Sequence, residues 1–338
     1  MDSKSRCIAT IKGEKPDRIP VFPLLMFFAK SRLGINYKTY ASEGSAMAEA
    51  QINIKEKFPI DAITACSDAF RITADLGADM VFPDDKPPYA SAPLIANEYD
   101  LKHLKKKDLK RLSNQSRMAD RILAVESMVR AVGNDSLVLG WVDMPFAEAC
   151  SVCGVSNFMM MMLENPQLAH DILDFLTGIV IEFALRQFEV GAPMIGAGDA
   201  AASLTSTDLF REFVLPYEQR VCSAIHNHNG LVKLHICGNT SHILEEMANS
   251  GADLFNVDHM VNLEEAKNVY GKRNLCYKGN LDPVVDMLQS TPDECEKKSI
   301  RCLEIAKDTK YMLSAGCEIP EDTKDEVFEA FCRAVDKV

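Results

Sequence analysis

The sequence predicts an α/β fold, a closed (β/α)8 TIM barrel that forms a single domain over residues 1–338. Three observations support this prediction. Short apolar runs alternate with helical patterns along the whole chain, eight such runs can be counted, and no Pro/Gly/Ser-rich linker divides them. Strands that alternate with helices pair in parallel. Eight units without a boundary favour a closed barrel over a doubly wound open sheet, which is the main alternative.

Each predicted strand is a short apolar run that ends in a polar residue or a glycine. In chain order these runs are Ile19–Leu25, Asp61–Cys66, Ser136–Val142, Pro193–Ala197, Leu231–Ile236, Ala252–Val257, Asn274–Tyr277 and Lys310–Ser314. The predicted helices are Tyr37–Phe58, Met118–Ala131, Phe158–Val190, Thr207–Asn229, Ser241–Ser250, Leu281–Leu288, Pro292–Ala306 and Asp322–Lys337. Gly191 and Gly251 are expected to end helices in the left-handed conformation, and Asp322 is expected to cap the last helix. The polar stretch from Tyr99 to Arg117 predicts an amphipathic surface helix.

Composition excludes several classes of protein. The chain carries 37 basic and 49 acidic residues, a net charge of −12, which argues against nucleic-acid binding because phosphate contacts require a basic surface. No run of about 18 apolar residues predicts a membrane helix, and the polar segment Met1–Lys12 does not resemble a secretory signal. Eleven cysteines, an odd number in a long chain, indicate free thiols in a reducing compartment. We therefore expect a soluble cytoplasmic enzyme.

Polar and thiol side chains follow most of the predicted strands. They are Ser67, Asp68, Asp143, Asp199, His235, Cys237, Asp258, His259, Asn280 and Cys317. In a parallel barrel the active site forms at the carboxyl ends of the strands, so we expect these side chains around one pocket. Single aspartates at such positions also begin turns and cap helices. Capping does not account for imidazole and thiol groups at neighbouring strand ends.

The strongest local signal is the segment Leu234-His235-Ile236-Cys237-Gly238. Residues two apart on a strand point to the same side, so His235 and Cys237 face one direction together. Cys317 follows the last apolar run and adds a second thiol at the same end. One imidazole and two thiolates leave one coordination position of a zinc ion free, which is the arrangement of a catalytic site. Water, a substrate or Asp258 could supply the fourth ligand.

Three further segments resemble the uroporphyrinogen decarboxylase superfamily. They are the opening Gly13–Pro20 (GEKPDRIP), Leu215-Pro216-Tyr217, and Lys278–Pro283 (KGNLDP). The resemblance extends from about residue 5 to the C-terminus and implies a (β/α)8 barrel. True decarboxylases of this superfamily carry an arginine-rich loop soon after the first strand, which binds substrate carboxylates. The corresponding segment here, Phe22–Lys30, is apolar, so those counter-charges are missing.

Within that superfamily, the His-x-Cys motif with a distant Cys is similar to the zinc-dependent corrinoid methyltransferases of the methylcobamide:coenzyme M type. This resemblance implies zinc bound by His235, Cys237 and Cys317, with Asp258 as a fourth ligand. It also implies a methylcobamide as methyl donor, a corrinoid protein as partner and a small thiol such as coenzyme M as acceptor. Asp68, Asp199 and Asn280 are then expected on the same rim, to orient the acceptor or bind the corrinoid.

Three other functions stay open from the sequence. A related enzyme could take a methyl group from a methoxy or methylamine donor, although such demethylases use a more carboxylate-rich zinc site. A decarboxylase would leave the His-x-Cys and Gly-Cys motifs unexplained, because such enzymes need no metal. A scaffold without catalytic activity that binds a metal or a corrinoid protein is the alternative outside enzymes.

Overall fold

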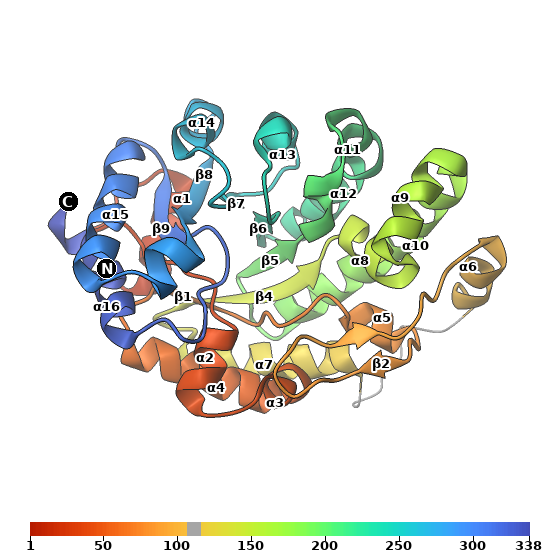
Figure 1. Cartoon of the computed structure of the whole chain (residues 1–338), viewed down its shortest axis with the longest axis horizontal. Coiled ribbons are helices and arrows are strands. Elements are labelled where there is room, and N and C mark those ends of the chain that lie inside the picture. The colour runs from red at the N-terminus through yellow and green to blue at the C-terminus, as the bar shows by residue number, and fades with distance from the viewer. Residues whose placement is uncertain (107–115) are drawn as a thin grey trace.

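The computed structural model describes residues 1–106 and 116–338, which form a curled parallel sheet surrounded by helices (Figure 1). Seven strands of the described residues form this sheet, in the order β1-β4-β5-β6-β7-β8-β9. Their bounds are β1 Ala62–Thr64, β4 Leu137–Asp143, β5 Met194–Gly198, β6 Leu231–His235, β7 Leu254–Asn256, β8 Cys276–Leu281 and β9 Tyr311–Ala315. All neighbouring pairs are parallel. The predicted α/β class is therefore confirmed.

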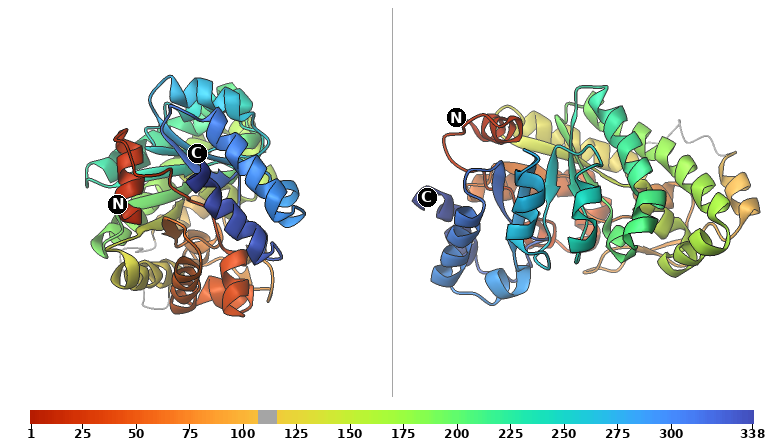
Figure 2. Two further views of the ribbon diagram at one scale, coloured as in Figure 1. Left: turned by 90° about the vertical axis from the view of Figure 1, so that its left-hand side faces the viewer. Right: turned by 90° about the horizontal axis from the view of Figure 1, so that it is seen from above.

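The helices lie outside the curled sheet, and both chain termini lie at the same end of the molecule (Figure 2). Before β4 the helices are α1 Ser3–Lys12, α2 Phe27–Leu33, α3 Tyr37–Ser42, α4 Gly44–Lys57, α5 Arg71–Asp75, α6 Glu98–Leu104 and α7 Arg117–Val132. Between β4 and β7 they are α8 Pro145–Cys153, α9 Val155–Glu164, α10 Pro166–Glu189, η1 Ala200–Leu204, α11 Thr207–Phe213, α12 Leu215–His226, η2 Ser241–Ile243 and α13 Leu244–Met247. After β7 come α14 Leu263–Ala266, η3 Lys267–Gly271, η4 Pro283–Leu288, α15 Pro292–Ile305, α16 Asp325–Arg333 and η5 Ala334–Lys337.

The first predicted strand, Ile19–Leu25, is present only as two isolated parallel bridges. Val21 pairs with Leu313 and Leu24 pairs with Glu318, both at the β9 edge of the sheet. The carbonyl of Val21 also accepts a hydrogen bond of 2.8 Å from the Asp61 amide, just before β1. This segment thus lies between the two edge strands of the seven-stranded sheet. Its pairing is too irregular to form a regular strand.

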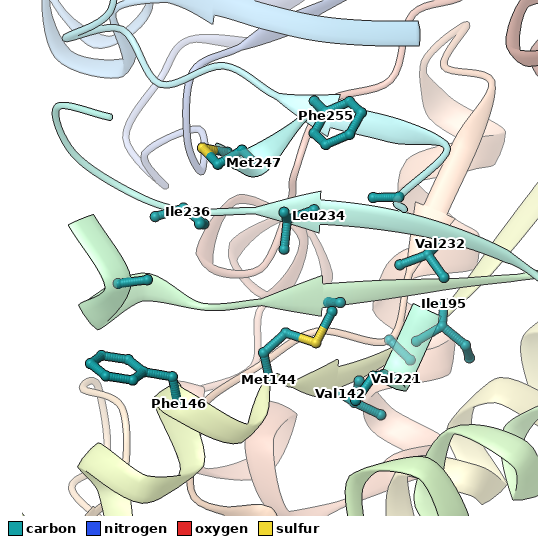
Figure 3. Packing of buried hydrophobic residues seen from close by; sticks show 14 of the residues in the cluster. Val142, Met144, Phe146, Ile195, Val221, Val232, Leu234, Ile236, Met247 and Phe255 are labelled. Atoms are coloured by element: carbon teal, nitrogen blue, oxygen red, sulfur yellow. The ribbon is translucent and has the colours of Figure 1, made fainter. Parts of the chain in front are cut away.

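Strand β6 shows why its polar residues share one face. Val232, Leu234 and Ile236 pack with Val221 of α12 and Met247 of α13 in the hydrophobic layer between sheet and helices (Figure 3). Alternate residues of a strand point to opposite faces. The other set, Lys233, His235 and Cys237, therefore faces the inside of the curled sheet. The predicted alternation of apolar and reactive side chains is confirmed on this strand.

Two glycines of β5 make room for the single tryptophan. Trp141 of β4 pairs with Gly196, and Asp143 pairs with Gly198. A Cβ atom at Gly196 would overlap the Trp141 ring, and one at Gly198 would lie 2.9 Å from it. The indole ring therefore lies flat against β5, with its face towards Lys233 of β6 at 4.8 Å.

Several predicted helices are broken where the sequence places an N-cap or a proline. The predicted helix Phe158–Val190 divides at Asn165-Pro166, because Asn165 caps α10 and Pro166 occupies its first turn. The helix Thr207–Asn229 divides before Leu215-Pro216, where the proline lies in the first turn of α12 without a side-chain cap. Tyr37–Phe58 divides at Glu43, also without a side-chain cap. Gly191 adopts positive φ directly after α10, as predicted. Gly251 also has positive φ, but it does not end a helix, because α13 ends at Met247.

The structure differs from the sequence analysis in three further places. The prediction that Asp322 caps the last helix is wrong, since α16 begins after Lys324 and no side chain caps it. The sequence did not indicate the small antiparallel pair of β2 Met80–Val81 and β3 Tyr89–Ala90. Of the predicted surface helix from Tyr99 to Arg117, the described residues include α6 at its start, and residues 107–115 lie outside the described part of the chain.

Among the described residues no single helix has the length and apolar composition needed to cross a membrane. The pair Pro145–Cys153 and Val155–Glu164 meets the criterion only when both helices are taken together, and the chain bends by 105° between them.

Candidate functional site

Three of the predicted site residues meet at the carboxyl ends of β6 and β9. The Cys237 Sγ lies 3.0 Å from the His235 Nε2 and 3.7 Å from the Cys317 Sγ. The Cys317 Sγ lies 3.7 Å from the same ring nitrogen. These three residues, here called the thiol cluster, are the group of His, Cys, Asp and Glu residues in the described chain whose ligand atoms converge within 4.8 Å of one another.

The thiol cluster depends on tight backbone geometry around it. His235 ends β6, and Gly238 turns the chain directly after Cys237 with a φ of 91°. Cys317 follows Gly316, where any Cβ atom would overlap the backbone of His259. The side chain of Asn256 donates a hydrogen bond of 2.7 Å to the Gly316 carbonyl and so fixes this turn. The sequence brings the two thiols together because glycine allows close approach at both turns.

The spacing of the thiol cluster fits a tetrahedral metal site. Zn–S bonds of about 2.3 Å and Zn–N bonds of about 2.05 Å place two tetrahedral sulfur ligands about 3.8 Å apart and a sulfur and a nitrogen about 3.6 Å apart. The observed separation of Cys237 and Cys317 is 3.7 Å, as is that of Cys317 and His235. The His235–Cys237 distance of 3.0 Å is shorter. One neutral imidazole and two thiols are also the donor set that zinc prefers.

The two thiols differ sharply in acidity. The hydrogen bond with Cys237 lowers the pKa of Cys317 to about 3, and the contact with His235 acts in the same direction. The same bond raises the pKa of Cys237 well above its ordinary value. Burial lowers the pKa of His235, so its ring is held in the neutral form that binds metals. Its Nδ1 makes no hydrogen bond with any described residue.

Two buried lysines lie on the inner face of the sheet below the thiol cluster. Lys233, two residues before His235, is fully buried, and burial lowers the pKa of Lys233 to about 8. Lys278 of β8 donates hydrogen bonds to the Phe22 carbonyl at 2.8 Å and to the Ser314 hydroxyl at 2.9 Å. Burial also lowers the pKa of Lys278 well below its ordinary value. The sequence analysis missed both residues, although Lys233 shares the alternation that identified His235.

Asp258 lies beside the thiol cluster but does not join the converging ligand atoms. Its carboxylate accepts hydrogen bonds from the Gly238 amide at 2.9 Å and from the Met260 amide at 3.0 Å. It also contacts the His259 Nδ1 at 3.1 Å. Asp258 therefore holds the turn after Cys237 in place, and both of its oxygens are already used in the described structure.

Asp68 lies at the end of β1 in a cluster of arginines. Both oxygens of Asp68 accept hydrogen bonds from Arg117, at 2.7 and 2.8 Å, and one also accepts from Ser67 at 2.7 Å. The Ser67 hydroxyl in turn accepts from Arg71 and Arg121, each at 3.0 Å. Burial alone would raise the pKa of Asp68, but the hydrogen bonds and charges of the arginines lower it overall.

Asp199 and Asn280 are also engaged within the protein. Asp199 is fully buried, accepts a hydrogen bond of 2.8 Å from the Ala147 amide, and interacts with the buried carboxyl of Glu218. Burial raises the pKa of Asp199 to about 8 and that of Glu218 well above its ordinary value, so the folded protein favours the protonated form of both acids. The amide of Asn280 donates to the carbonyls of Asp258 and Val261 at 3.2 and 2.6 Å. Both residues lie at strand ends, as predicted, with their polar atoms turned inward.

Glu318 is a third residue that the sequence analysis missed. It follows Cys317, and its carboxylate accepts hydrogen bonds from the amides of Met26, at 2.9 Å, and Phe27. Burial raises the pKa of Glu318 to about 8. The segment that carries Cys317 is thereby tied to the start of α2, which the resemblance had identified only as an apolar loop.

Comparison with known proteins places the chain among enzymes. A family model described as uroporphyrinogen decarboxylase (URO-D) matches residues 2–338. The chain is 26% identical to the uroporphyrinogen decarboxylase of Nostoc sp. over 93% of this chain and 91% of that protein. It is 25% identical to the methylcobamide:CoM methyltransferase MtbA of Methanosarcina acetivorans, over 94% of this chain and 92% of that protein. Both types of enzyme are thus similar to this chain at low identity.

A solved structure described as a methyltransferase from Methanosarcina mazei shares the fold. It superposes with a TM-score of 0.86 at 23% identity and covers 100% of this chain and 99% of that one. At this identity the likeness supports the fold.

Proposed function

The chain belongs to the uroporphyrinogen decarboxylase family, and on that premise we propose that it is a zinc-dependent methyltransferase that moves a methyl group from a methylated corrinoid to a small thiol. The observation that carries this proposal is the convergence of one imidazole and two thiols at the strand ends, within 4.8 Å of one another. A decarboxylase has no use for such a donor set. One imidazole and two thiolates form a catalytic zinc site that keeps one position open for a substrate.

His235, Cys237 and Cys317 would hold the metal, and the acceptor would take the remaining position. When bound, zinc supplies a Lewis acid that keeps a coordinating thiol deprotonated at neutral pH. The low pKa of Cys317 and the neutral ring of His235 support this role, because both residues are ready to bind a cation without first losing a proton. Asp258 acts through the Gly238 amide and keeps Cys237 in position.

The reaction forms a carbon–sulfur bond and breaks a carbon–cobalt bond, and the electron pair of the broken bond stays on cobalt. The thiol proton passes to solvent when the acceptor binds. Both oxygens of Asp68, one oxygen of Asp199 and the amide nitrogen of Asn280 are used in internal bonds, which supports a role in shaping the rim rather than in direct contact with the corrinoid. A corrinoid protein is the partner that this reaction requires.

We also propose that the chain is a single-domain, closed eight-stranded barrel. The segment around Val21 would be the eighth strand, since it hydrogen-bonds both to β9 through Leu313 and to the residue before β1 through Asp61. Closure would place the thiol cluster at the mouth of the barrel, where the active sites of such folds lie.

Decarboxylation is the second candidate, favoured by the similarity to decarboxylases. Against it, the segment Phe22–Lys30 contains a single cation, Lys30, and its ammonium pairs with Glu321 at 2.5 Å and Asp85 at 3.6 Å. That segment therefore offers no free cation to a substrate rich in carboxylates.

One experiment tests the proposal in two steps. Metal content is measured in protein purified without chelators, and the expected result is about one zinc per chain. The zinc-loaded protein is then mixed with methylcobalamin and a panel of small thiols, and demethylation is followed in the cobalt spectrum. Absence of zinc in the folded protein, or methyl transfer at an equal rate by metal-free protein, would overturn the proposal.

A further inference from the structure

The inner face of the sheet carries an unusual charge below the thiol cluster. Lys233 is 0% exposed, and its Nζ has no hydrogen-bond partner among the described residues. Neither Lys233 nor Lys278 forms an ion pair within residues 1–106 and 116–338. A buried ammonium without a carboxylate is costly, so some other group has to offset its charge.

The surroundings of Lys233 show which groups can do so. Its Nζ lies 4.8 Å from the centre of the Trp141 ring, whose face attracts cations. Lys233 lies on β6 two residues before His235 and four before Cys237, so its side chain lies on the face of the sheet that carries the thiol cluster. The ammonium is thus buried, held in place by an aromatic ring, and faces the position where sulfur ligands gather.

We propose that Lys233 selects the charge of the acceptor, because its buried ammonium favours an anionic sulfur ligand at the open position over a neutral one. This inference rests on the proposed function and adds to it the residue that sets the ligand class, namely thiolates. Two cysteine thiolates balance the charge of Zn²⁺, so a third thiolate leaves one negative charge in excess. Lys233 offsets that excess charge. A neutral thioether brings no charge and gains nothing from the ammonium.

The test compares two ligands that differ by one methyl group. Zinc-loaded protein is titrated by calorimetry with 2-mercaptoethanol, which binds as a thiolate and releases its proton to buffer, and with 2-(methylthio)ethanol, which stays neutral. In Lys233→Met the affinity for the thiol should fall roughly 10-fold or more, because a unit charge at close range in a buried site is removed. The affinity for the thioether should change by no more than about twofold, since it carries no charge.

Variants of the same position separate charge from packing. Lys233→Arg keeps the charge and should restore the preference for the thiol, and Lys233→Gln is a second neutral variant if Lys233→Met does not fold. Lys278→Met is the matched control, since Lys278 is an equally buried lysine whose ammonium has two hydrogen-bond acceptors. If the ratio of the affinities for thiol and thioether changes equally in Lys278→Met, the selection of ligand charge cannot be assigned to Lys233.

The outcomes also separate this inference from the proposed function. Zinc content is measured first in every variant. A native protein without zinc overturns the proposed function. If Lys233→Met keeps the native zinc content, two outcomes overturn only the role of Lys233. One is an unchanged ratio of the affinities for thiol and thioether, and the other is an equal loss of affinity for both ligands.

Discussion

Two regions at the carboxyl end of the sheet carry polar groups that the sequence marks equally, yet they are built differently. At the end of β1, both oxygens of Asp68 are bound by Arg117, and Ser67 links two more arginines to it. At the ends of β6 and β9, the sulfurs of Cys237 and Cys317 contact only each other and His235 within the described side-chain network. In the first region both carboxylate oxygens are already bound within the protein, and the cluster supports the fold. The second keeps its donor atoms free for a ligand.

The largest expected effect is on metal binding at the thiol cluster. In Cys317→Ala the zinc affinity should fall by at least ~100-fold, because loss of a direct ligand costs more than the 10- to 100-fold loss caused by removing an outer partner. Competition with a chromogenic chelator measures it. Cys153→Ala removes a fully buried thiol of α8 and is the control, which should bind zinc as the native protein does. Unchanged zinc affinity in Cys317→Ala would remove the distinction between the two regions.

Asp68→Asn tests the other side of the comparison. It leaves Arg117 without its buried counter-charge, so the free energy of unfolding should fall by about 3–5 kcal/mol. Zinc content should stay unchanged. Urea denaturation measures the first quantity. Glu126→Gln is the control. It breaks the exposed ion pair with Arg130 and should lower the free energy of unfolding by no more than about 0.5 kcal/mol. Loss of zinc in a folded Asp68→Asn protein would contradict a purely supporting role for this region.

The acid pair of Asp199 and Glu218 gives a pH-dependent prediction. Burial raises the pKa of Asp199 to about 8 and that of Glu218 well above its ordinary value. In the unfolded chain these groups ionise near pH 4, so the folded state binds more protons and stability falls as pH rises from about 4 to about 8. The glutamine of Glu218→Gln cannot ionise. As pH rises over this range, the free energy of unfolding of the variant should therefore increase relative to that of the native protein by up to about 1.4 kcal/mol per pH unit.

Urea unfolding of Glu218→Gln and the native protein at pH 5 and pH 8 measures that difference. The exposed Glu212, replaced by Gln, is the control and should show no such trend. A native protein whose advantage over Glu218→Gln grows with pH would show that the pair is ionised in the folded state.

The smallest expected effects concern glycines. Gly196→Ala pushes a methyl group into the Trp141 ring and should cost about 1–3 kcal/mol. Gly178→Ala, in α10 with no atom within 4 Å of the added Cβ, should stabilise by about 0.5–1 kcal/mol. Thermal denaturation measures both changes. Equal effects of the two substitutions would show that the space around Trp141 adapts more readily than the packing suggests.

The alternation of strands and helices could be predicted because apolar runs and glycines mark the sheet locally. Seven of the eight predicted strands overlap strands of the structure, although Asn274–Tyr277 shares only its last two residues with β8. Ile19–Leu25 forms only isolated bridges, because its pairing depends on the two sheet edges meeting rather than on its own residues. The helix breaks at Asn165 and Leu215 could have been found from the prolines that follow them.

The thiol cluster was visible in the sequence because His235 and Cys237 share a strand face and Cys317 follows another strand. The sequence could not show which polar side chains already have hydrogen-bond partners within the protein. Asp258 was expected as a ligand candidate, and its two bonds to the Gly238 and Met260 amides depend on how the loops fold back. Glu318 is bound by the distant amides of Met26 and Phe27, and Lys233 lies against the distant Trp141 ring, so a local pattern contains no sign of these partners.

The glycines of β5 have a practical consequence. They allow Trp141, the only tryptophan of the chain, to lie beside Lys233 and one layer below the thiol cluster. Indole emission responds to the charges near the ring, and here no second indole obscures it. The protein therefore contains an intrinsic fluorescent reporter at the floor of its site, through which arrival of a cation or a sulfur ligand can be followed in real time without any label.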